Sequence, residues 1–196
     1  MNGGNFTVEG TPLEGLVVVQ CRAFGDERGL LFESWREEAF AAMGIPGPFV
    51  QDNHSRSGRG VLRGLHWQAP PAPQGKLVRC TRGAVWDVAV DIRAGSPTFG
   101  RFHAETLAAG DPAPKLLWVP PGFAHGFLAT EAEAEVQYRC TAYWNRDAER
   151  CILWNDPDLG IPWPVAAEPV LSPKDRGGMT FAAYGREPSF RWKETA

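Results

Sequence analysis

The fold of this chain is decided by the stretch Ala84-Val85-Trp86-Asp87-Val88-Ala89-Val90-Asp91-Ile92-Arg93, whose side chains alternate with a period of two. The even-numbered positions form an apolar face: Trp86, Val88, Val90 and Ile92. The odd-numbered positions form a mixed face: Val85, Asp87, Ala89 and Asp91. Because successive side chains of a β-strand point to opposite sides, the pattern predicts a strand. The extended run Lys76–Arg82 precedes it across an Arg82-Gly83 turn, so we expect a β-hairpin over residues 76–93.

Short extended segments separated by Gly or Pro recur along the chain. Further strands are predicted at Leu16–Gln20, Leu30–Glu33, Gly60–Gln68, Lys115–Val119, Phe123–Ala129, Ala134–Trp144 and Ile152–Trp154. A helix is predicted over Trp35–Met43, with Ser34 as N-cap, Glu37 completing a capping box and Gly44 ending it. Many short strands with one early helix are typical of a β-sandwich or a barrel such as a jelly roll. The predicted fold class is therefore all-β.

The composition agrees with that architecture. The 196 residues include 22 Gly and 17 Pro, a combined share above the usual ~12%, and this favours frequent turns. Apolar residues make up 43% and charged residues 22%, values that exclude a wholly disordered chain. No linker interrupts the pattern, so we expect a single domain over residues 1–196. Its N-terminal arm should pack on the barrel or a partner, and so should the Gly-rich tail after Leu171, which we place over the sheet edge.

Charge and hydropathy exclude several classes of function. The net charge is −3 and the pI is about 5.8, which disfavours a general nucleic-acid binder. No apolar run approaches the ~18 residues of a membrane span, and the N-terminus MNGGNFTVEG lacks the features of a signal peptide. The four cysteines form no C-x-x-C pair, as expected of free thiols in a reducing compartment. We therefore expect a cytoplasmic protein with neither a nucleic-acid nor a membrane partner.

Two of the four histidines stand in unusual surroundings. His66 lies in a predicted strand that contains Gly60 and Gly64, and glycine inside a strand marks a bulge or the close approach of another group. His125 follows the turn Pro120-Pro121-Gly122, which returns an imidazole toward the sheet. Each histidine is either a hydrogen-bonded core residue or part of a site. Two imidazoles are too few ligands for a closed metal site, so no metal is predicted.

Tyr138 and Asp175 each allow two interpretations. Tyr138 shares a strand face with Val136 and Cys140, so it is either a core tyrosine or an acid aimed into a barrel interior. A buried phenol needs a polar partner in either case. Asp175 follows Ser172 by three residues, so it either completes a capping box or serves as a site carboxylate.

Four further charged residues are ordinary surface groups when taken singly. Glu149 lies in a turn, and Arg28, Arg63 and Lys76 lie in separate segments. Together the three basic side chains can form an anion site on a slightly acidic chain.

Ordered motifs over most of the chain resemble one family. They are Asp26-x-Arg28-Gly29-x-x-x-Glu33, Gln51-Asp52-Asn53-x-Ser55, Gly60-Val61-Leu62-Arg63-Gly64-Leu65-His66, Gln74-Gly75-Lys76-Leu77-Val78-Arg79, Asp87-Val88-Ala89-Val90-Asp91-x-Arg93, Ser96-Pro97-Thr98-Phe99-Gly100, Pro121-Gly122-Phe123-Ala124-His125-Gly126-Phe127, Trp154-Asn155-Asp156-Pro157 and Leu171-Ser172-x-Lys174-Asp175. They resemble the dTDP-4-dehydrorhamnose 3,5-epimerases of deoxysugar synthesis. The resemblance runs from about residue 13 to residue 176.

The resemblance implies a cupin-type double-stranded β-helix (jelly roll), a homodimer and no cofactor. The implied substrate is dTDP-4-dehydro-6-deoxy-D-glucose, inverted at C3 and C5 to dTDP-4-dehydro-L-rhamnose. It also implies that His66 is the base, that Asp175 orients it and that Tyr138 is the acid. The implied substrate-binding residues, some reaching a partner's site, are Arg28, Glu33, Gln51, Asn53, Arg63, Lys76, His125, Trp144, Glu149 and Lys174. Trp144 and Trp67 depart from the tyrosines expected in many relatives, and Gln68 stands where a metal-binding cupin offers a second histidine.

The chemistry explains these residue types. A 4-keto group acidifies the hydrogens on C3 and C5, and a histidine with a pKa near 6.5 can take such a proton at neutral pH. The enolate oxygen then needs a cationic or donating neighbour, a role open to Lys76 or His125. One difficulty is that Arg63 and His66 fall on opposite faces of a regular strand. We therefore expect either a bulge at Gly64 or a pyrophosphate bound at the barrel rim.

Other functions remain open at this stage. A single-carbon epimerase of an antibiotic sugar shares most of the motifs, and a 3,4-ketoisomerase is a more distant enzyme alternative. A non-catalytic cupin that binds a sugar nucleotide belongs to a different class. Binding alone needs no base–acid pair, so His66, Tyr138 and Asp175 together favour an enzyme.

Overall fold

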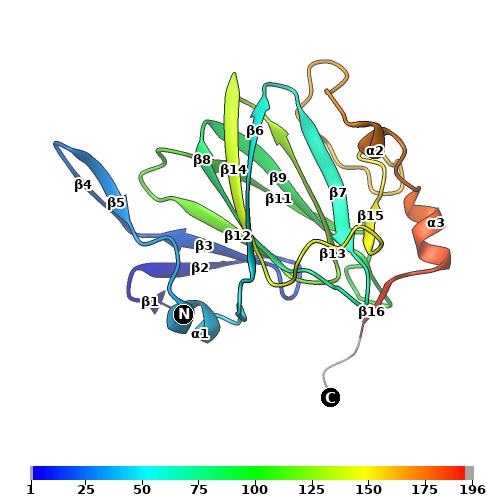
Figure 1. The fold of residues 1–196 in the computed structure, drawn as a ribbon, viewed down its shortest axis with the longest axis horizontal. Helices are drawn as coiled ribbons and strands as arrows, with labels where there is room; N and C mark the ends of the chain where they lie inside the picture. The colour runs from blue at the N-terminus through cyan, green and yellow to red at the C-terminus, as the bar shows by residue number, and fades with distance from the viewer. Residues whose placement is uncertain (1, 193–196) are drawn as a thin grey trace.

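Residues 2–192 are described by a computed structural model, in which two antiparallel β-sheets pack face to face (Figure 1). The seven-stranded sheet has the order β1 (Asn2–Gly3), β2 (Phe6–Gly10), β3 (Val17–Cys21), β12 (Lys115–Val119), β8 (Lys76–Arg82), β14 (Glu133–Cys140) and β6 (Gln51–Gly58). The five-stranded sheet has the order β11 (Phe102–Ala108), β9 (Ala84–Asp91), β13 (Phe123–Ala129), β7 (Leu62–Gln68) and β15 (Glu149–Cys151). The prediction of an all-β fold is confirmed.

The predicted hairpin over residues 76–93 is wrong. Both runs are strands, but β8 pairs with β12 and β14 in one sheet, whereas β9 pairs with β11 and β13 in the other. The chain crosses between the sheets at Gly83, which has a φ of +65° and packs against the backbone of Glu133. Because a side chain at Gly83 would collide with that backbone, the glycine belongs to a crossover rather than to a two-strand turn.

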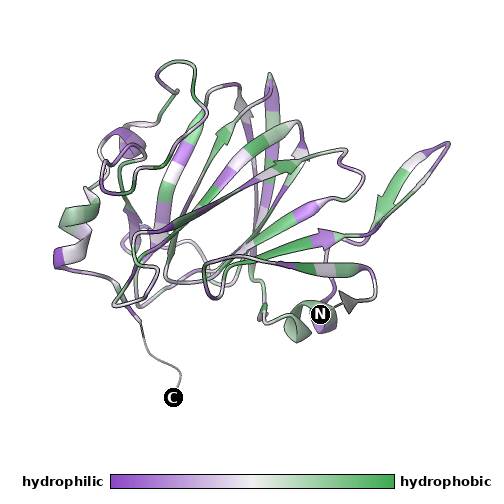
Figure 2. Ribbon diagram, turned by 180° about the vertical axis from the view of Figure 1, so that it is seen from behind, coloured by the Kyte–Doolittle hydropathy of each residue, from purple (hydrophilic) through white to green (hydrophobic). Residues whose placement is uncertain are grey.

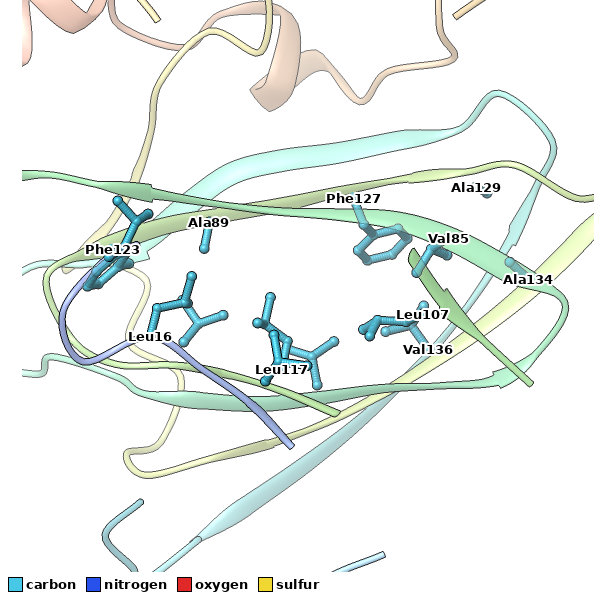
Figure 3. Close-up of a cluster of buried hydrophobic side chains, with 14 residues drawn as sticks. Leu16, Val85, Ala89, Leu107, Leu117, Phe123, Phe127, Ala129, Ala134 and Val136 are labelled. Carbon is cyan, nitrogen blue, oxygen red and sulfur yellow. The ribbon is translucent and has the colours of Figure 1, made fainter. Parts of the chain in front are cut away.

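The space between the two sheets contains a cluster of apolar side chains (Figure 3). Val85 and Ala89 reach it from the mixed face of β9, and Leu117 and Val136 reach it from the opposite sheet. Asp87 lies between Val85 and Ala89 on the same face of β9, so it points into the same interior. The interior face of β9 therefore places one carboxylate between two residues of the apolar core.

The C-terminal part of the chain covers the outer face of the five-stranded sheet. The apolar face of β9 packs there with Trp163 and Tyr184, and the phenol of Tyr184 donates a 2.6 Å hydrogen bond to the Ile92 carbonyl. This tail contains α2 (Pro173–Arg176), α3 (Phe181–Arg186) and β16 (Phe190–Arg191), and β16 pairs in parallel with β10 (Arg93–Ala94). We expected the tail over a sheet edge, and Met179 pairs in parallel with Ile152 beside the edge strand β15. The tail also covers a face, because both faces of β9 carry apolar residues that need a covering layer.

The one predicted early helix is shorter than expected. Helix α1 spans Glu37–Ala42, and Arg36 is its N-cap without a side-chain capping bond. Ser34 therefore does not cap it. The segment before α1 is extended because Trp35 packs edge-on against Phe49, so a tertiary contact overrides the local capping signal.

A two-stranded hairpin projects from the body of the molecule. It consists of β4 (Ala23–Asp26) and β5 (Gly29–Phe32), which pair antiparallel. Hydrophobic residues lie along it although it stands away from the sandwich (Figure 2), and the exposed ones are Phe24, Leu30 and Leu31. Such an arm carries apolar surface that this chain leaves uncovered.

Two further expectations concern thiols and membranes. All four cysteines are free thiols, and Cys21, Cys140 and Cys151 are buried. Among residues 2–192, no helix has both the length and the apolar character needed to cross a membrane.

Candidate active site

An irregularity in β7 brings Arg63 and His66 to the same cavity. His66 of β7 lies opposite His125 of β13, whereas Arg63 lies opposite Phe127, so β7 has one residue more than its partner between these points. Gly64 occupies that bulge with a φ of +133°, and a Cβ there would come 2.5 Å from the Gly126 Cα. The bulge breaks the alternation of the strand, and Arg63 and His66 consequently line one cavity.

That cavity has a volume of about 390 Å³ and lies between the two sheets. It is lined by Ser55, Arg63, His66, Lys76, His125, Phe127, Tyr138, Glu149, Ser172, Lys174 and Asp175. His66 comes from the five-stranded sheet, Tyr138 comes from the seven-stranded sheet, and Asp175 comes from α2 of the tail. The residues predicted as base, acid and orienting carboxylate thus face a common space.

His66 and Asp175 form a partly buried hydrogen-bonded pair, in which Nε2 of the imidazole contacts Oδ1 of the carboxylate. Ser172 Oγ donates a 2.7 Å hydrogen bond to the other oxygen, Oδ2. Burial raises the pKa of Asp175, but the hydrogen bonds from His66 and Ser172 outweigh that effect, and the net pKa lies below the ordinary value. Asp175 is therefore a carboxylate at neutral pH, with both oxygens bonded.

The pKa of His66 also lies below its ordinary value of 6.5. Burial is the main cause, the hydrogen bond to Asp175 opposes it, and the nearby charges of Lys174 and Lys76 lower the pKa further. An imidazole with a lowered pKa is neutral at pH 7 and is ready to accept a proton.

A second histidine–carboxylate pair lies beside the first. His125 Nε2 is 2.8 Å from Oδ1 of Asp87, which projects from β9 and is fully buried. Within the described residues, the other oxygen of Asp87 is buried and has no hydrogen-bond partner. Lys76 Nζ donates a 3.4 Å hydrogen bond to the His66 carbonyl. Burial lowers the pKa of Lys76, while the charge of Asp87 is among the groups that raise it.

Tyr138 is held in its protonated form. Burial raises the pKa of its phenol, Cys140 adds to this, and the charge of Arg63 opposes it. A phenol with a raised pKa remains able to donate a proton at neutral pH. Arg63 itself donates to Ser57 Oγ and the Arg56 carbonyl, and within residues 2–192 it has no carboxylate partner. Its charge is therefore available to an anion in the cavity.

The rim of the cavity carries an ion pair, between Lys174 Nζ and Glu149 Oε1 at 2.8 Å. Burial raises the pKa of Glu149, but Lys174 opposes this effect, and the net pKa lies below the ordinary value. A hydrogen bond with the Trp144 side chain lowers this pKa by a smaller amount, which places Trp144 near the pair. Gln51 and Asn53 do not line the cavity. The Gln51 side chain bonds to Asn53 Oδ1 and to the Trp144 backbone instead.

The structure does not bring Arg28 and Glu33 to the cavity within this chain. Arg28 lies at the tip of the β4–β5 hairpin, where it pairs with Asp26. Glu33 follows that hairpin and pairs with Arg36, while Asn5 donates to it. Their predicted role therefore depends on a second copy of the chain.

The comparisons with known proteins agree with this geometry. A family model described as dTDP-4-dehydrorhamnose 3,5-epimerase matches residues 10–183. The chain belongs to this family. A relative named dTDP-4-dehydrorhamnose 3,5-epimerase from Pseudomonas aeruginosa is 54% identical over 85% of this chain and 91% of its own length. The protein is accordingly a sugar-nucleotide isomerase by family.

Two solved structures within this family's fold are informative. The dTDP-6-deoxy-D-glucose-3,5-epimerase from Legionella pneumophila Philadelphia 1, in complex with dTDP-4-keto-L-rhamnose, has a TM-score of 0.90 and 41% identity, covering 96% of this chain and 99% of that one. ChmJ, a 3'-monoepimerase from Streptomyces bikiniensis in complex with dTDP-quinovose, has a TM-score of 0.85 and 36% identity, covering 92% and 91%. The cupin-like fold is therefore shared by two-carbon and one-carbon epimerases.

One group of side chains in this epimerase-family site has the spacing of metal ligands. The donor atoms of His66, Cys151 and Asp175 lie within 4.8 Å of one another. Burial raises the pKa of Cys151 to about 12, and its thiol lies 4.0 Å from Asp175 Oδ1 as a hydrogen-bond donor. The carboxylate oxygens already bond to His66 and Ser172. Hydrogen bonding accounts for this cluster, and the absence of a metal stays a prediction.

Two residues of the site region were not predicted from the sequence. Asp87 was assigned only to a strand face, although a carboxylate between Val85 and Ala89 on an inward face is a signal of a buried polar site. Gln68 was considered only as a missing metal ligand. Its side chain bonds to the loop that carries Trp144, a relation that no local pattern indicates.

Proposed function

We propose that the protein inverts C3 and C5 of dTDP-4-dehydro-6-deoxy-D-glucose to give dTDP-4-dehydro-L-rhamnose. The observation that carries this proposal is the placement of His66 and Tyr138 on opposite sheets around one cavity. Inversion of a carbon needs proton removal on one face and proton delivery on the other. A base and an acid that reach a ring from two opposing sheets meet that requirement.

His66 removes the proton from the carbon next to the 4-keto group. Its lowered pKa keeps the imidazole neutral beforehand, and Asp175 stabilises the imidazolium that forms. Ser172 holds the far oxygen of Asp175, so the carboxylate keeps its orientation toward the ring. The same base serves C3 and C5 in turn. Between the two steps His66 releases its proton to solvent, Tyr138 regains one from solvent, and the sugar ring reorients.

The negative charge of the enolate develops on the oxygen at C4. Lys76 and His125 line the same cavity and supply a cation and an imidazole to that oxygen. Tyr138 then returns a proton to the opposite face of the carbon, since its raised pKa keeps the phenol protonated until that step. The carbonyl supplies the acidity of both carbons, so we propose a reaction without a cofactor.

The nucleotide part binds at the rim. Arg63 pairs with the pyrophosphate, because its guanidinium lines the cavity without a carboxylate partner among residues 2–192. Lys174 and Glu149 lie at the same opening, where Trp144 offers an indole for stacking on thymine. Gln51 and Asn53 lie beside Trp144 and complete this end of the binding site.

We propose that the working form is a homodimer of one-domain chains in the cytoplasm. The β4–β5 hairpin exposes Phe24, Leu30 and Leu31, and a second copy would cover this apolar surface. The same contact would bring Arg28 and Glu33 to the partner's nucleotide. Free thiols and a nucleotide-sugar substrate fit a reducing, cytoplasmic compartment.

A one-carbon epimerase is the second candidate, because ChmJ shares the fold. The higher identity to the Pseudomonas aeruginosa and Legionella pneumophila 3,5-epimerases favours inversion at two carbons. A non-catalytic binding protein is disfavoured by the His66–Asp175 pair, because binding alone needs no base.

Turnover in deuterated water tests the proposal. We expect deuterium at both C3 and C5 of the product. With Tyr138→Phe we expect C–H exchange at one or both carbons but impaired inversion, because His66 can return a deuteron to the face it came from. Label at a single carbon would establish a one-carbon epimerase. Binding without any label would establish the non-catalytic alternative.

A further inference from the structure

The loop that follows β14 exposes aromatic side chains, while the peptide groups on both sides of Trp144 are hydrogen-bonded. Trp144 is 55% exposed and Tyr143 is more exposed still. An exposed loop of this kind usually keeps its backbone polar groups in water. Here the peptide groups on both sides of Trp144 bond to buried or half-buried side-chain amides of the two sheets.

Gln68, at the end of β7, makes the central contacts. It is only 3% exposed, and its Oε1 accepts a 2.7 Å hydrogen bond from the Asn145 amide. Its Nε2 donates to the Tyr143 carbonyl at 3.2 Å and to the Ala72 carbonyl at 2.9 Å. One buried side chain therefore bonds to the residue before Trp144 and to the residue after it.

Gln51, at the start of β6, supplies the remaining contact. Its Oε1 accepts a 2.8 Å hydrogen bond from the Trp144 amide itself. Its Nε2 donates to Asn53 Oδ1 at 3.0 Å, so the two polar ends of this side chain are both occupied. Because β6 and β7 belong to different sheets, the loop is hydrogen-bonded to both of the sheets that enclose the cavity.

The loop returns to the cavity at Glu149, which lines it and interacts with Lys174. Asn145 contributes to this path, because its Oδ1 accepts from the Asp147 amide at 2.9 Å. Trp144 thus occupies a fixed position near the mouth, with its side chain exposed to an incoming ligand.

We propose that Gln68, together with Gln51, is a positioning residue that holds Trp144 ready to stack on the base of the nucleotide. The inference rests on the proposed function, in which Trp144 makes that contact. A stacking surface that is already ordered loses less conformational freedom on binding than a flexible one. Gln51, expected from the family resemblance to bind substrate, acts in this arrangement through the loop.

A double-mutant cycle on dTDP binding, measured by calorimetry, tests the proposal. Trp144→Ala should weaken binding about 5- to 150-fold, the range that corresponds to one aromatic stacking contact. Gln68→Met keeps the length of the side chain but removes its amide, and it should weaken binding and raise KM while kcat at saturation stays unchanged. In the Trp144→Ala background, Gln68→Met should have no further effect, because it acts only through the indole.

Gln74→Met is the matched control. Gln74 Nε2 donates a 2.7 Å hydrogen bond to the Ala142 carbonyl, the same kind of bond one peptide farther from Trp144. This variant should bind dTDP as the wild type does. A merely structural role for Gln68 would lower the melting temperature in both glutamine variants without separating their dTDP affinities.

Three outcomes overturn the inference. The first is wild-type affinity in Gln68→Met, and the second is equal weakening by Gln68→Met in the presence and absence of Trp144. The third is unchanged binding in Trp144→Ala, which removes the base contact from the site but leaves deuterium labelling by the wild type as the separate test of function. If Gln68→Met does not fold, Gln51→Met completes the same cycle, because it removes the bond to the Trp144 amide.

Discussion

The two histidine–carboxylate pairs of the cavity lie side by side and are built differently. His66 and His125 are direct neighbours in the register of β7 and β13. The carboxylate of the first pair, Asp175, comes from the tail, whereas that of the second, Asp87, comes from the adjacent strand β9. The tail segment that covers the sheet thus supplies half of one pair, and the sheet alone supplies the other.

Exposure and hydrogen bonding separate the two pairs further. The His66 side chain is 19% exposed and that of His125 is 7% exposed. Both oxygens of Asp175 are bonded, whereas one oxygen of Asp87 is buried and has no hydrogen-bond partner among residues 2–192. An accessible imidazole with a fully bonded carboxylate suits proton transfer. A buried pair with an unsatisfied carboxylate suits a fixed negative charge beside Lys76.

The largest expected effect follows from removing the accessible imidazole. His66→Ala should lower kcat by at least about 10³-fold, within the 10²–10⁴-fold range of general acid–base catalysis. Binding of dTDP should persist, because Arg63 is unchanged. Steady-state kinetics and calorimetry measure the two effects.

His103→Ala is the control for His66→Ala. His103 lies on β11 outside the cavity, its side chain is 20% exposed, and it also faces a carboxylate, that of Glu105. Turnover should be unchanged in this variant. Wild-type turnover in His66→Ala would remove His66 from the role of base and with it the contrast between the pairs.

Asp175→Asn should have the next largest effect, a loss in kcat on the order of 10²-fold. Its pH dependence is the sharper measurement. Since the neutral form of His66 is active and its pKa lies below 6.5, the acid limb of kcat/KM should lie below pH 6.5. Asp175 raises that pKa, so its neutralisation should lower it further and move the acid limb to lower pH. A limb that moves to higher pH would contradict this assignment.

Arg63→Ala tests whether the β7 bulge delivers a substrate-binding charge beside His66. The free energy of dTDP binding should weaken by about 1.5–3 kcal/mol, the range for hydrogen bonds to charged groups. The dissociation constant should therefore rise roughly 10- to 150-fold. Arg59→Ala is the control, because Arg59 pairs with Glu131 on the surface and does not line the cavity. Equal affinities of the two variants would exclude Arg63 from the nucleotide site.

The strands could be predicted from the sequence more reliably than their partners. The alternation over residues 84–93 identified β9 and the residues on each of its two faces, because side-chain direction is a local property of a strand. The hairpin with residues 76–82 was wrong, because pairing depends on which sheet the chain enters after Gly83. Helix α1 was placed too early for a similar reason, since Trp35 packs against Phe49.

The site residues that belong to recognisable motifs could be predicted from the sequence. Gly64 was the signal for the bulge that places Arg63 with His66, and the family resemblance brought in Tyr138 and Asp175. The contact between Asp87 and His125 could not be predicted, because it depends on the pairing of β9 with β13. The second pair is therefore the part of the comparison that most needs a direct test.

Asp87→Asn should have the smallest effect on rate and a small effect on stability. The Asn oxygen can still accept from His125 Nε2, but the negative charge is gone. Because Asp87 raises the pKa of Lys76, that pKa should fall and the basic limb of kcat should move to lower pH, with a loss of about 10-fold at the optimum. The free energy of unfolding should change less than when a fully bonded carboxylate is neutralised, because one oxygen of Asp87 has no hydrogen bond to lose among residues 2–192. Thermal unfolding and a pH–rate profile measure both.

Asp91→Asn is the matched control, since Asp91 lies on the same face of the same strand and is equally buried. Its oxygens accept hydrogen bonds from Arg93, Ser96 and Thr98, and these bonds hold its pKa below the ordinary value despite burial. This variant should therefore lose about 1.5–3 kcal/mol of unfolding free energy. If Asp87→Asn instead lost stability as Asp91→Asn does and kept its full kcat, Asp87 would be a structural carboxylate. Only the His66–Asp175 pair would then take part in the reaction.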